Sequence, residues 1–319
     1  MHSNERKFIH YQSAKHDIMV GDDIRMSAKR INIRVTSNHV GISRQSSQIG
    51  QSKMIWSCPL CASELRLMGQ SMRCDNNHSF DCAKEGYVNL LPAHHKNSKQ
   101  PGDSGAMIAA RRRIHDAELY LPLAEEIITV IEACTNIKTL LDIGCGEGYY
   151  DGEISRRFGD IDLYGVDVSK DAIRFASKRY PAHHYAVANA LNLPLISGSV
   201  DLALRIFAPS NDVEINRVLA DDGLYLEVGP APMHLWELRE ALYESPREHS
   251  THRREADGMI MLREGQCRYE SSLNSNLLEA LVSATPFAFK GDRNRRAALL
   301  EHDQMTMTMS FDWRLFKKR

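Results

Sequence analysis

The sequence predicts an α/β fold in which a mostly parallel sheet, covered by helices on both faces, follows a small cysteine-rich domain. Strand-like apolar runs alternate with helical periods between residues 139 and 230, and residues 305–313 alternate strictly between apolar and polar side chains. A Cys-Cys pair at 58 and 61 and a Cys-His pair at 74 and 78 mark the segment that begins at Cys58. At 319 residues and 43% hydrophobic side chains, the chain is long enough for one full α/β core and a small accessory unit.

The elements of the sheet can be placed in order. Apolar side chains from Leu123 to Ile131 recur at helical spacing and predict a helix before the first strand. Met305–Trp313 alternates with period two, which predicts a last, antiparallel strand with one buried face. The expected strands before it are Thr139–Ile143, Asp162–Val166, His183–Val187, Val200–Phe207 and Gly223–Val228. This order of strands and helices is typical of a parallel sheet covered on both faces.

The composition narrows the class of protein. The chain has 40 basic and 41 acidic residues, a formal net charge of -1, so any surface for nucleic acid must be local. Seven cysteines, an odd number, and an opening unlike a signal peptide disfavour a secreted disulfide framework and favour a cytoplasmic location. No run approaches the roughly eighteen apolar residues of a membrane span, so no membrane partner is expected.

The cysteine-rich segment has the spacing of a zinc site. Cys58 and Cys61 place two thiolates on one tight turn, and Cys74 and His78 supply a second pair after twelve residues. Four such ligands in two knuckles can close a tetrahedron around Zn(2+), and so short a segment depends on the metal for much of its folding free energy. Cys82 is a possible competitor for the fourth place, and unliganded buried cysteines are the alternative without a metal. We expect a structural metal, not one that activates water.

A glycine-rich turn follows the first expected strand. Residues 140–148 read Leu-Leu-Asp-Ile-Gly-Cys-Gly-Glu-Gly, with Gly144 and Gly146 where the strand gives way to a helix. Glycines let the backbone turn sharply and approach a ligand, and the start of a helix offers free N–H groups. Such a turn is also typical of dinucleotide-binding enzymes, which are the main alternative.

Three details favour S-adenosylmethionine, a sulfonium nucleotide, over a dinucleotide. The spacing is G-x-G-x-G rather than G-x-G-x-x-G, and Asp142 stands inside the strand end, where it can organise the loop and the amino-acid part of the cofactor. Asp167 closes the next strand, where a carboxylate can accept both ribose hydroxyls, although a plain solvated carboxylate is the alternative. Asn189 falls where the third strand brings side chains beside an adenine ring.

These motifs together carry a resemblance to a known family. Residues 58–113, including Lys84–Pro92 and Pro101–Ser104, and the loop Asp142–Tyr150 resemble the RlmA family of 23S rRNA (guanine-N1)-methyltransferases. The resemblance runs from about Met54 to the C-terminus. It implies a zinc-ribbon-like domain followed by a Rossmann-like class I methyltransferase domain, a homodimer, and N1-methylguanosine in a domain II hairpin loop of 23S rRNA as the product.

The resemblance also implies site residues. It places the zinc ligands on Cys58, Cys61, Cys74 and His78, and the cofactor contacts on Tyr120, Gly146, Glu147 and His234. The chain has Ala-Asn-Ala at 188–190, a departure that weakens the expected contact from Asn189. The implied domains are a zinc-binding domain at 54–92, a linker at 93–115 and the methyltransferase domain at 116–319. Residues 1–53, rich in polar residues, are expected to be a disordered extension or a mis-assigned start before Met54.

No residue identifies itself as a catalytic base. Glu147, His234 and Asp212 are candidates for accepting the guanine N1 proton, although each is also typical of a binding or surface group. The fourth strand ends in Arg-Ile-Phe-Ala-Pro-Ser at 205–210 and not in Asp/Asn-Pro-Pro-Tyr, which disfavours methylation of the exocyclic amine of adenine.

Contact with RNA would require local cations and exposed aromatic rings. The rings that could stack on an unpaired base are Tyr87, Phe207 and Trp236, all of which are also typical core residues. The candidate cation clusters are Arg111–Arg113, Lys96 with Lys99, Lys290 with 293–296, and Lys317–Arg319, each of which could equally be a solvated surface.

Two other functions share part of these features. A small-molecule methyltransferase acting on a quinone-type metabolite would need the glycine loop and Asp167 but not the zinc knuckle. A zinc-stapled RNA-binding protein with an inactive cofactor fold would not need the intact loop at Asp142.

Overall fold

The computed structural model describes residues 54–92, 102–249, 255–285 and 293–319. The expected N-terminal extension, part of the expected linker and the cations Lys96, Lys99 and Lys290 lie outside the described residues. None of the helices in the described ranges has the length and apolarity needed to cross a membrane.

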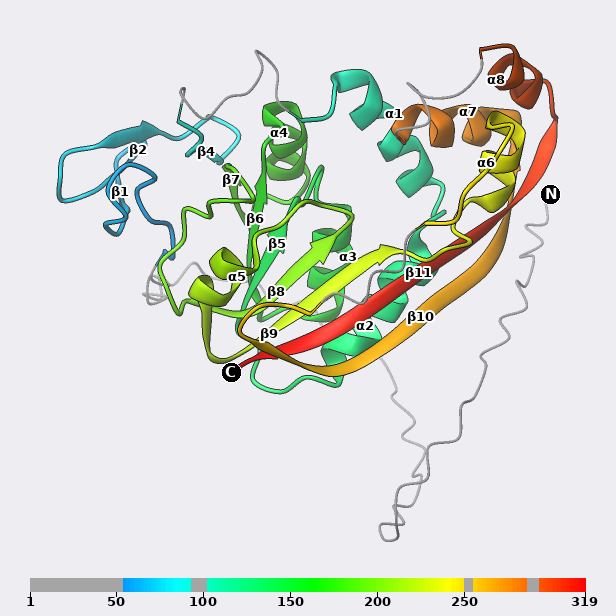
Figure 1. Cartoon of the computed structure of the whole chain (residues 1–319). Coiled ribbons are helices and arrows are strands. Elements are labelled where there is room, and N and C mark those ends of the chain that lie inside the picture. Colours follow the sequence, from blue (N-terminus) through cyan, green and yellow to red (C-terminus); the bar gives the residue numbers. More distant parts are fainter. Residues whose placement is uncertain (1–53, 93–101, 250–254, 286–292) are drawn as a thin grey trace, which may run out of the picture. The chain divides into compact units, whose positions relative to one another are not determined.

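The described residues form two sheets (Figure 1). A small antiparallel sheet has the order β1-β2-β3, and an eight-stranded sheet has the order β10-β11-β9-β8-β5-β6-β7-β4. The strands are β1 (Arg66–Met68), β2 (Ser71–Arg73), β3 (Ser79–Asp81), β4 (Val88–Asn89), β5 (Thr139–Ile143), β6 (Asp162–Asp167), β7 (His184–Val187), β8 (Val200–Ile206), β9 (Leu219–Pro230), β10 (Met259–Asn274) and β11 (Gln304–Lys318). The helices are α1 (Gly105–Asp116), α2 (Leu121–Glu132), α3 (Tyr149–Arg157), α4 (Lys170–Arg179), α5 (Asp212–Val218), α6 (Trp236–Leu242), α7 (Ser275–Ala284) and α8 (Arg293–Leu300).

The parallel core of the large sheet confirms the five strands expected between residues 139 and 230. Strand β5 lies between β6 and β8, β6 pairs with β7 and β8 pairs with β9, all in parallel. The centres of β5 and β6 are buried on both faces, which explains why they read as continuous apolar runs. The last strand, β11, is antiparallel to β9 as expected.

Strands β10 and β11 depart from the expectation. The alternation at 305–313 predicts one buried face, but β11 is buried on both faces from Met307 to Phe311. Thr308 lies on the polar face and is covered by α6, because its N–H and hydroxyl both donate to Glu237, at 2.8 and 2.6 Å. The sequence does not predict β10, because this strand is largely exposed and its apolar and polar side chains do not alternate. It nevertheless pairs with β11 from Met259 to Asn274.

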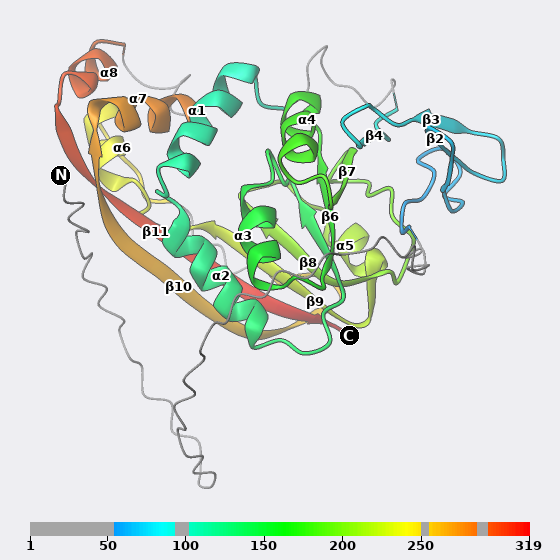
Figure 2. The same ribbon diagram turned by 180° about the vertical axis from the view of Figure 1, so that it is seen from behind.

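The two largest cores pack on opposite faces of the sheet. Helices α2 and α3 lie in front of the sheet in Figure 2 and bury Leu123, Ile127 and Ile154 against it. On the other face, α5 contributes Ile215 and Val218 to a second core. That second core also contains Trp56, Cys58, Leu65, Met72 and Cys74 from the zinc-ligand segment.

The cysteine-rich segment is joined directly to the large sheet. Strand β4 pairs in parallel with β7, so the segment supplies the outermost strand at that end. The Ser57 N–H donates to the Pro194 carbonyl at 2.8 Å, and the Trp56 ring meets Tyr164 edge-on at 5.2 Å. The segment therefore shares a core and a sheet with the rest of the fold.

Helix α1 occupies part of the segment that the sequence predicts to be a linker. Ser104 caps its start by accepting the Met107 N–H at 3.3 Å, and Ile108 and Ile114 are buried on its inner face. The helix brings Arg111 and His115 to the glycine loop, as described below.

Candidate functional site

The four expected zinc ligands converge. The Sγ atoms of Cys58, Cys61 and Cys74 and a ring nitrogen of His78 all lie within 4.8 Å of one another. The His78 Nδ1 lies 3.4 Å from both Cys58 Sγ and Cys74 Sγ, and the sulfurs of Cys61 and Cys74 are 3.7 Å apart. Tetrahedral Zn(2+) with bonds of about 2.3 Å to sulfur and 2.0 Å to nitrogen requires roughly these separations, 3.8 and 3.5 Å. The donor set therefore fits one zinc ion with no open position.

Cys82 does not join this cluster. It lies outside the four-residue group of possible ligands and forms an isolated bridge with Val88 instead. The choice of His78 over Cys82 agrees with this geometry.

The glycine loop is tied to the end of β6. Gly144, Gly146 and Gly148 have φ values of +80°, +57° and +77°, a region that favours glycine. A Cβ on Gly144 would lie 2.4 Å from the Cβ of Ala208. The Gly146 N–H donates to Asp167 Oδ2 at 3.0 Å, so the carboxylate at the end of β6 fixes the loop.

Asp167 keeps acceptor capacity beyond its backbone partners. Its Oδ1 accepts the Ser169 N–H at 2.7 Å and its Oδ2 accepts Gly146. Because each carboxylate oxygen offers about two acceptor sites, both can still accept a ribose hydroxyl. Asn189 follows β7 on the neighbouring strand, but its Oδ1 accepts the Leu191 N–H at 2.9 Å. The side-chain NH2 group of Asn189 is therefore the part that suits a contact with a purine ring.

Asp142 lies beneath the loop and faces a second carboxyl group. It is 2% exposed, and Asp151 of α3 is fully buried beside it. Burial and the charge of the partner raise the pKa of Asp142, and burial raises that of Asp151 to about 7. The Tyr185 hydroxyl donates to Asp151 Oδ2 at 3.0 Å. The pair therefore retains a proton and supports the loop from below.

Glu147 is paired with a histidine that the sequence did not suggest. The His115 Nδ1 lies 2.5 Å from Glu147 Oε1, and both side chains are buried. Burial opposes ionisation of Glu147, but the hydrogen bond from His115 and the charge of Arg111 hold its pKa below the usual value. His115 stacks on Tyr149 at 4.1 Å. An ionised, hydrogen-bonded Glu147 is a binding group and a poor proton acceptor.

Two further expected contacts lie in an aromatic cluster. Tyr120 ends the turn before α2 and meets Phe311 at 5.8 Å, and the His234 ring meets Phe311 at 4.5 Å. The Ser310 N–H donates to His234 Nδ1 at 3.3 Å, and burial lowers the pKa of His234 to about 3. His234 is therefore a neutral imidazole with its proton on Nε2, a hydrogen-bond donor.

Phe207 is the exposed member of that cluster. It is 43% exposed and has a φ of 56°, rare for a bulky residue. It lies where β8 ends, 6.4 Å from both Tyr120 and His234. Of the three rings considered for stacking, Tyr87 is buried and Trp236 is half-buried. Asp212, the third candidate base, opens helix α5.

The arginines at 111–113 do not form one patch. The Arg111 guanidinium pairs with Asp103 at 2.6 Å, whereas Arg112 lies over the Phe175 ring at 4.8 Å. Arg113 donates to the carbonyl of Asn276 in α7 at 2.9 Å. Three consecutive helical side chains point in directions about 100° apart, so a run of cations on a helix is divided among its faces.

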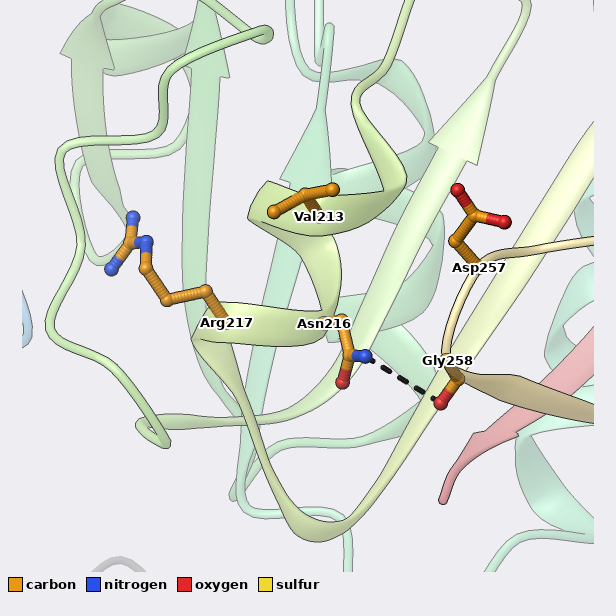
Figure 3. A pocket seen from close by; sticks show the side chains of 5 residues that line it. All are labelled: Val213, Asn216, Arg217, Asp257 and Gly258. Carbon is orange, nitrogen blue, oxygen red and sulfur yellow. Dashed lines mark hydrogen bonds between the residues drawn. The ribbon is translucent and has the colours of Figure 1, made fainter.

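Two surface hollows differ in their relation to the glycine loop. One of about 440 Å³ has Glu147 in its wall, with Arg112, Phe175, Lys178 and Arg179 around it. The other, of about 350 Å³, lies between α5 and the turn before β10 (Figure 3). There Asn216 Nδ2 donates to the Gly258 carbonyl at 3.5 Å, and Val213, on α5, is 65% exposed. The second hollow contains none of the expected site residues.

Comparisons with known proteins agree with both parts of the site. Residues 56–99 match the family described as RlmA, N-terminal, a zinc ribbon, and residues 140–223 match a methyltransferase domain. A Bacillus subtilis protein with the provisional name 23S rRNA (guanine-N(1)-)-methyltransferase YxjB is 32% identical over 273 residues, which cover 80% of this chain and 94% of that one. The chain belongs to the RlmA family of 23S rRNA (guanine-N1)-methyltransferases.

Two other relatives extend the comparison within the family. The 23S rRNA (guanine(748)-N(1))-methyltransferase of Streptomyces fradiae is 38% identical over 189 residues, which cover 58% of this chain and 66% of that protein. A provisionally named 23S rRNA (guanine-N(1)-)-methyltransferase of Micromonospora griseorubida is 30% identical over 286 residues, 82% and 96% of the two chains. The RlmA assignment confirms a methyltransferase domain that uses S-adenosylmethionine and a Cys3His zinc ribbon.

Proposed function

We propose that the protein transfers a methyl group from S-adenosylmethionine to N1 of a guanine in a domain II hairpin loop of 23S rRNA. The observation that carries the proposal is that one fold combines a Cys3His knuckle with a G-x-G-x-G loop. The segment that holds the knuckle adds β4 to the sheet that carries the loop, beside β7. The names of the relatives support the choice of guanine N1 and of 23S rRNA.

The donor supplies an electrophilic methyl group on a sulfonium for in-line displacement. The residues of the chain would position it: Asp167 accepts the ribose hydroxyls, the glycine loop admits the amino-acid part, and His234 donates from Nε2. When bound, the donor would give up its methyl group to guanine N1, with the S–C bond breaking as the N–C bond forms, while these residues hold the two reactants in line. Positioning of this kind accounts for most of the help that a displacement requires.

The N1 proton would leave to water. Glu147 is held as a carboxylate by His115, and the lowered pKa of His234 makes it a weak base. Neither group has a pKa near neutrality, where a general base is most effective. The buried pair of Asp142 and Asp151 retains a proton but lies beneath the loop. We therefore assign no general base.

Phe207 would hold the target base. Its exposed ring stands at the end of β8, 6.4 Å from Tyr120 and from His234, two residues expected to contact the donor. Proteins that read unpaired RNA bases commonly stack them on aromatic rings. The strained φ of Phe207 is of the kind that concentrates at functional sites.

The homodimer that the resemblance implies is also part of the proposal. The outermost strand β10 exposes three consecutive apolar side chains, Ile260, Met261 and Leu262, which are 52, 43 and 49% exposed. A long edge strand with exposed apolar side chains is suited to pairing with another chain. Light scattering of the purified protein should give twice the mass of the chain, and a monomer across micromolar concentrations would refute this part.

One assay tests the function. Purified zinc-loaded protein is incubated with labelled S-adenosylmethionine and with unmodified 23S rRNA, and the product is mapped by reverse transcription and nucleoside mass spectrometry. We expect one N1-methylguanosine in the domain II loop. Transfer to quinone-type metabolites but not to RNA would select the small-molecule enzyme, and tight RNA binding without transfer would select the inactive RNA-binding protein.

A further inference from the structure

Helix α1 places an arginine at the glycine loop, where no sequence motif indicates a ligand contact. The Arg111 Nη1 is 3.8 Å from the position of a Cβ built on Gly146, the central glycine of the loop. The side chain is 28% exposed, so it borders the loop and still contacts solvent. Its ion pair with Asp103, at 2.6 Å, holds the guanidinium in this place.

Three carboxylates lie near the guanidinium of Arg111. Asp103, Glu147 and Asp167 all raise the pKa of Arg111 against the effect of its burial, which places these three carboxylates near one guanidinium. Two of them already have defined partners, since Glu147 is bonded to His115 and Asp167 holds the loop through Gly146. We call this group of charges around the glycine loop the donor cradle. Its surplus of negative charge suits the sulfonium and ammonium groups of the donor but repels the donor's α-carboxylate.

A guanidinium has five N–H donors in a planar fork that matches a carboxylate. The structure records one partner for Arg111 among the described residues, the carboxylate of Asp103 on Nη1. The rest of the fork is therefore available to a ligand at the loop. Its neighbours Arg112 and Arg113 point elsewhere, to Phe175 and to the carbonyl of Asn276.

We propose that Arg111, aimed by Asp103, binds the α-carboxylate of S-adenosylmethionine and so selects the donor by its amino-acid end. The inference rests on the proposed function for the identity of the donor. It goes beyond that function because it assigns a ligand contact to a residue on a helix outside the methyltransferase motifs. Asp103 acts as a positioning residue, because it contacts Arg111 and not the ligand.

The test compares two ligands on several variants by calorimetry, without RNA. S-adenosylmethionine carries the carboxylate, and decarboxylated S-adenosylmethionine lacks it and has one more net positive charge. In Arg111→Met, the affinity for S-adenosylmethionine should fall roughly 10- to 100-fold, the value of a charge-assisted hydrogen-bonded pair. The affinity for the decarboxylated ligand should stay the same or rise, because the variant cradle has lost a positive charge.

Three further variants sharpen the test. Arg111→Lys should recover part of the lost affinity, and Asp103→Asn should lower the affinity for S-adenosylmethionine by a smaller factor, about threefold to tenfold. Arg112→Met is the matched control, since its guanidinium lies over Phe175, and it should leave both affinities within about twofold. Thermal melting and zinc content verify that each variant is folded.

The outcomes separate this inference from the proposed function. An equal loss of affinity for both ligands in Arg111→Met, or unchanged affinity for both, would overturn the role of Arg111 while rRNA methylation by the unaltered protein still supports the function. Binding of neither ligand by the unaltered protein would overturn both. A ligand preference that depends on residue 111 supports the inference even where the mapped nucleotide differs from the one proposed.

Discussion

The zinc knuckle and the donor cradle are two sites built in different ways. The knuckle takes all its ligands from residues 58–78, and their atoms already stand at the separations that one zinc ion requires. The cradle that we propose for the donor would assemble Arg111, the loop at Gly146, Asp167 and His234 from a helix, two strand ends and a distant turn. The first site is specified by spacing along the chain, and the second exists only when the sheet is formed.

The largest effect should come from removing a zinc ligand. This change tests whether the zinc-binding segment needs its metal in order to fold. Cys74→Ala should lose stoichiometric zinc and unfold the segment around β1–β3, because structural zinc contributes about 10 kcal/mol to the folding of such segments. Metal analysis and thermal melting measure both effects. Cys82→Ser is the control and should retain one zinc per chain. Equal zinc loss in the two variants would show that the ligand set is wrong.

The variant Gly144→Ala tests whether the glycine loop is required for donor binding. The new Cβ would lie 2.4 Å from the Cβ of Ala208, and φ is +80°, so the loop must shift. We expect a loss of stability of about 1–3 kcal/mol and at least tenfold weaker donor binding by calorimetry, with zinc retained. Gly159→Ala, where the added Cβ meets nothing within 4 Å, should change neither. Unchanged donor binding in Gly144→Ala would mean that the loop does not hold the donor.

The buried carboxyl pair gives the fold beneath the loop a pH dependence opposite in sign to that of a zinc knuckle, whose ligands must lose their protons to bind the metal. Burial raises the pKa of Asp151 from 3.8 to about 7, so the folded state binds the proton more tightly than the unfolded state. The resulting stabilisation is complete below pH 3.8 and is lost as the pH rises through about 7. Asp151→Asn should remove this fall, on the order of 2–4 kcal/mol, from the free energy of unfolding between about pH 5 and about pH 8.

Denaturant titrations at a series of pH values measure the difference between Asp151→Asn and the unaltered protein. Only that difference is informative, because His234, with its lowered pKa, contributes the opposite dependence as the pH falls below 6.5. Asp160→Asn, an exposed control, should follow the unaltered protein. Parallel stability curves for Asp151→Asn and the unaltered protein would show that the pair does not retain a proton.

The smallest effect should be the removal of the ring at Phe207, which separates RNA contact from donor contact. Phe207→Leu should raise the KM for RNA about tenfold, since stacking of a base on an aromatic ring is worth about 1–3 kcal/mol. Donor affinity should change less than about threefold, because Phe207 is the exposed member of the cluster with Tyr120 and His234 and is not part of the glycine loop. A lower donor affinity with unchanged KM for RNA would place Phe207 in the cradle instead.

The sequence identified the knuckle and the buried strands because their signals are local. Ligand spacing at Cys58 and Cys61 and the continuous apolar run of β5 need no knowledge of the fold. The sequence did not indicate α1 as a helix, because its exposed side carries the arginines and its buried side only a few apolar residues. The contact of His115 with Glu147 spans 32 residues and leaves no pattern in the sequence.

The arginines at 111–113, proposed from the sequence as an RNA-binding cluster, also show that a sequence pattern does not reveal which side chains share a surface. A run of like charges predicts a phosphate patch only where the side chains share a face, and consecutive residues of a helix do not. Once α1 is formed, the three guanidinium groups reach an aspartate, an aromatic ring and a backbone carbonyl. The expected contacts of Tyr120, Asn189 and His234 with the donor stay predictions, although the structure brings Tyr120 and His234 into one aromatic cluster.

Strand β4, only Val88–Asn89, completes the rim of the large sheet beside β7. Unpaired backbone groups on a sheet margin act as a template for strands of other molecules. Removal of zinc by a chelator should unfold the segment that contains β4. The backbone N–H and C=O groups at the outer edge of β7 would then be exposed. We expect the demetallated protein to precipitate or oligomerise through this exposed strand edge. Zinc would then prevent aggregation in addition to holding the segment folded.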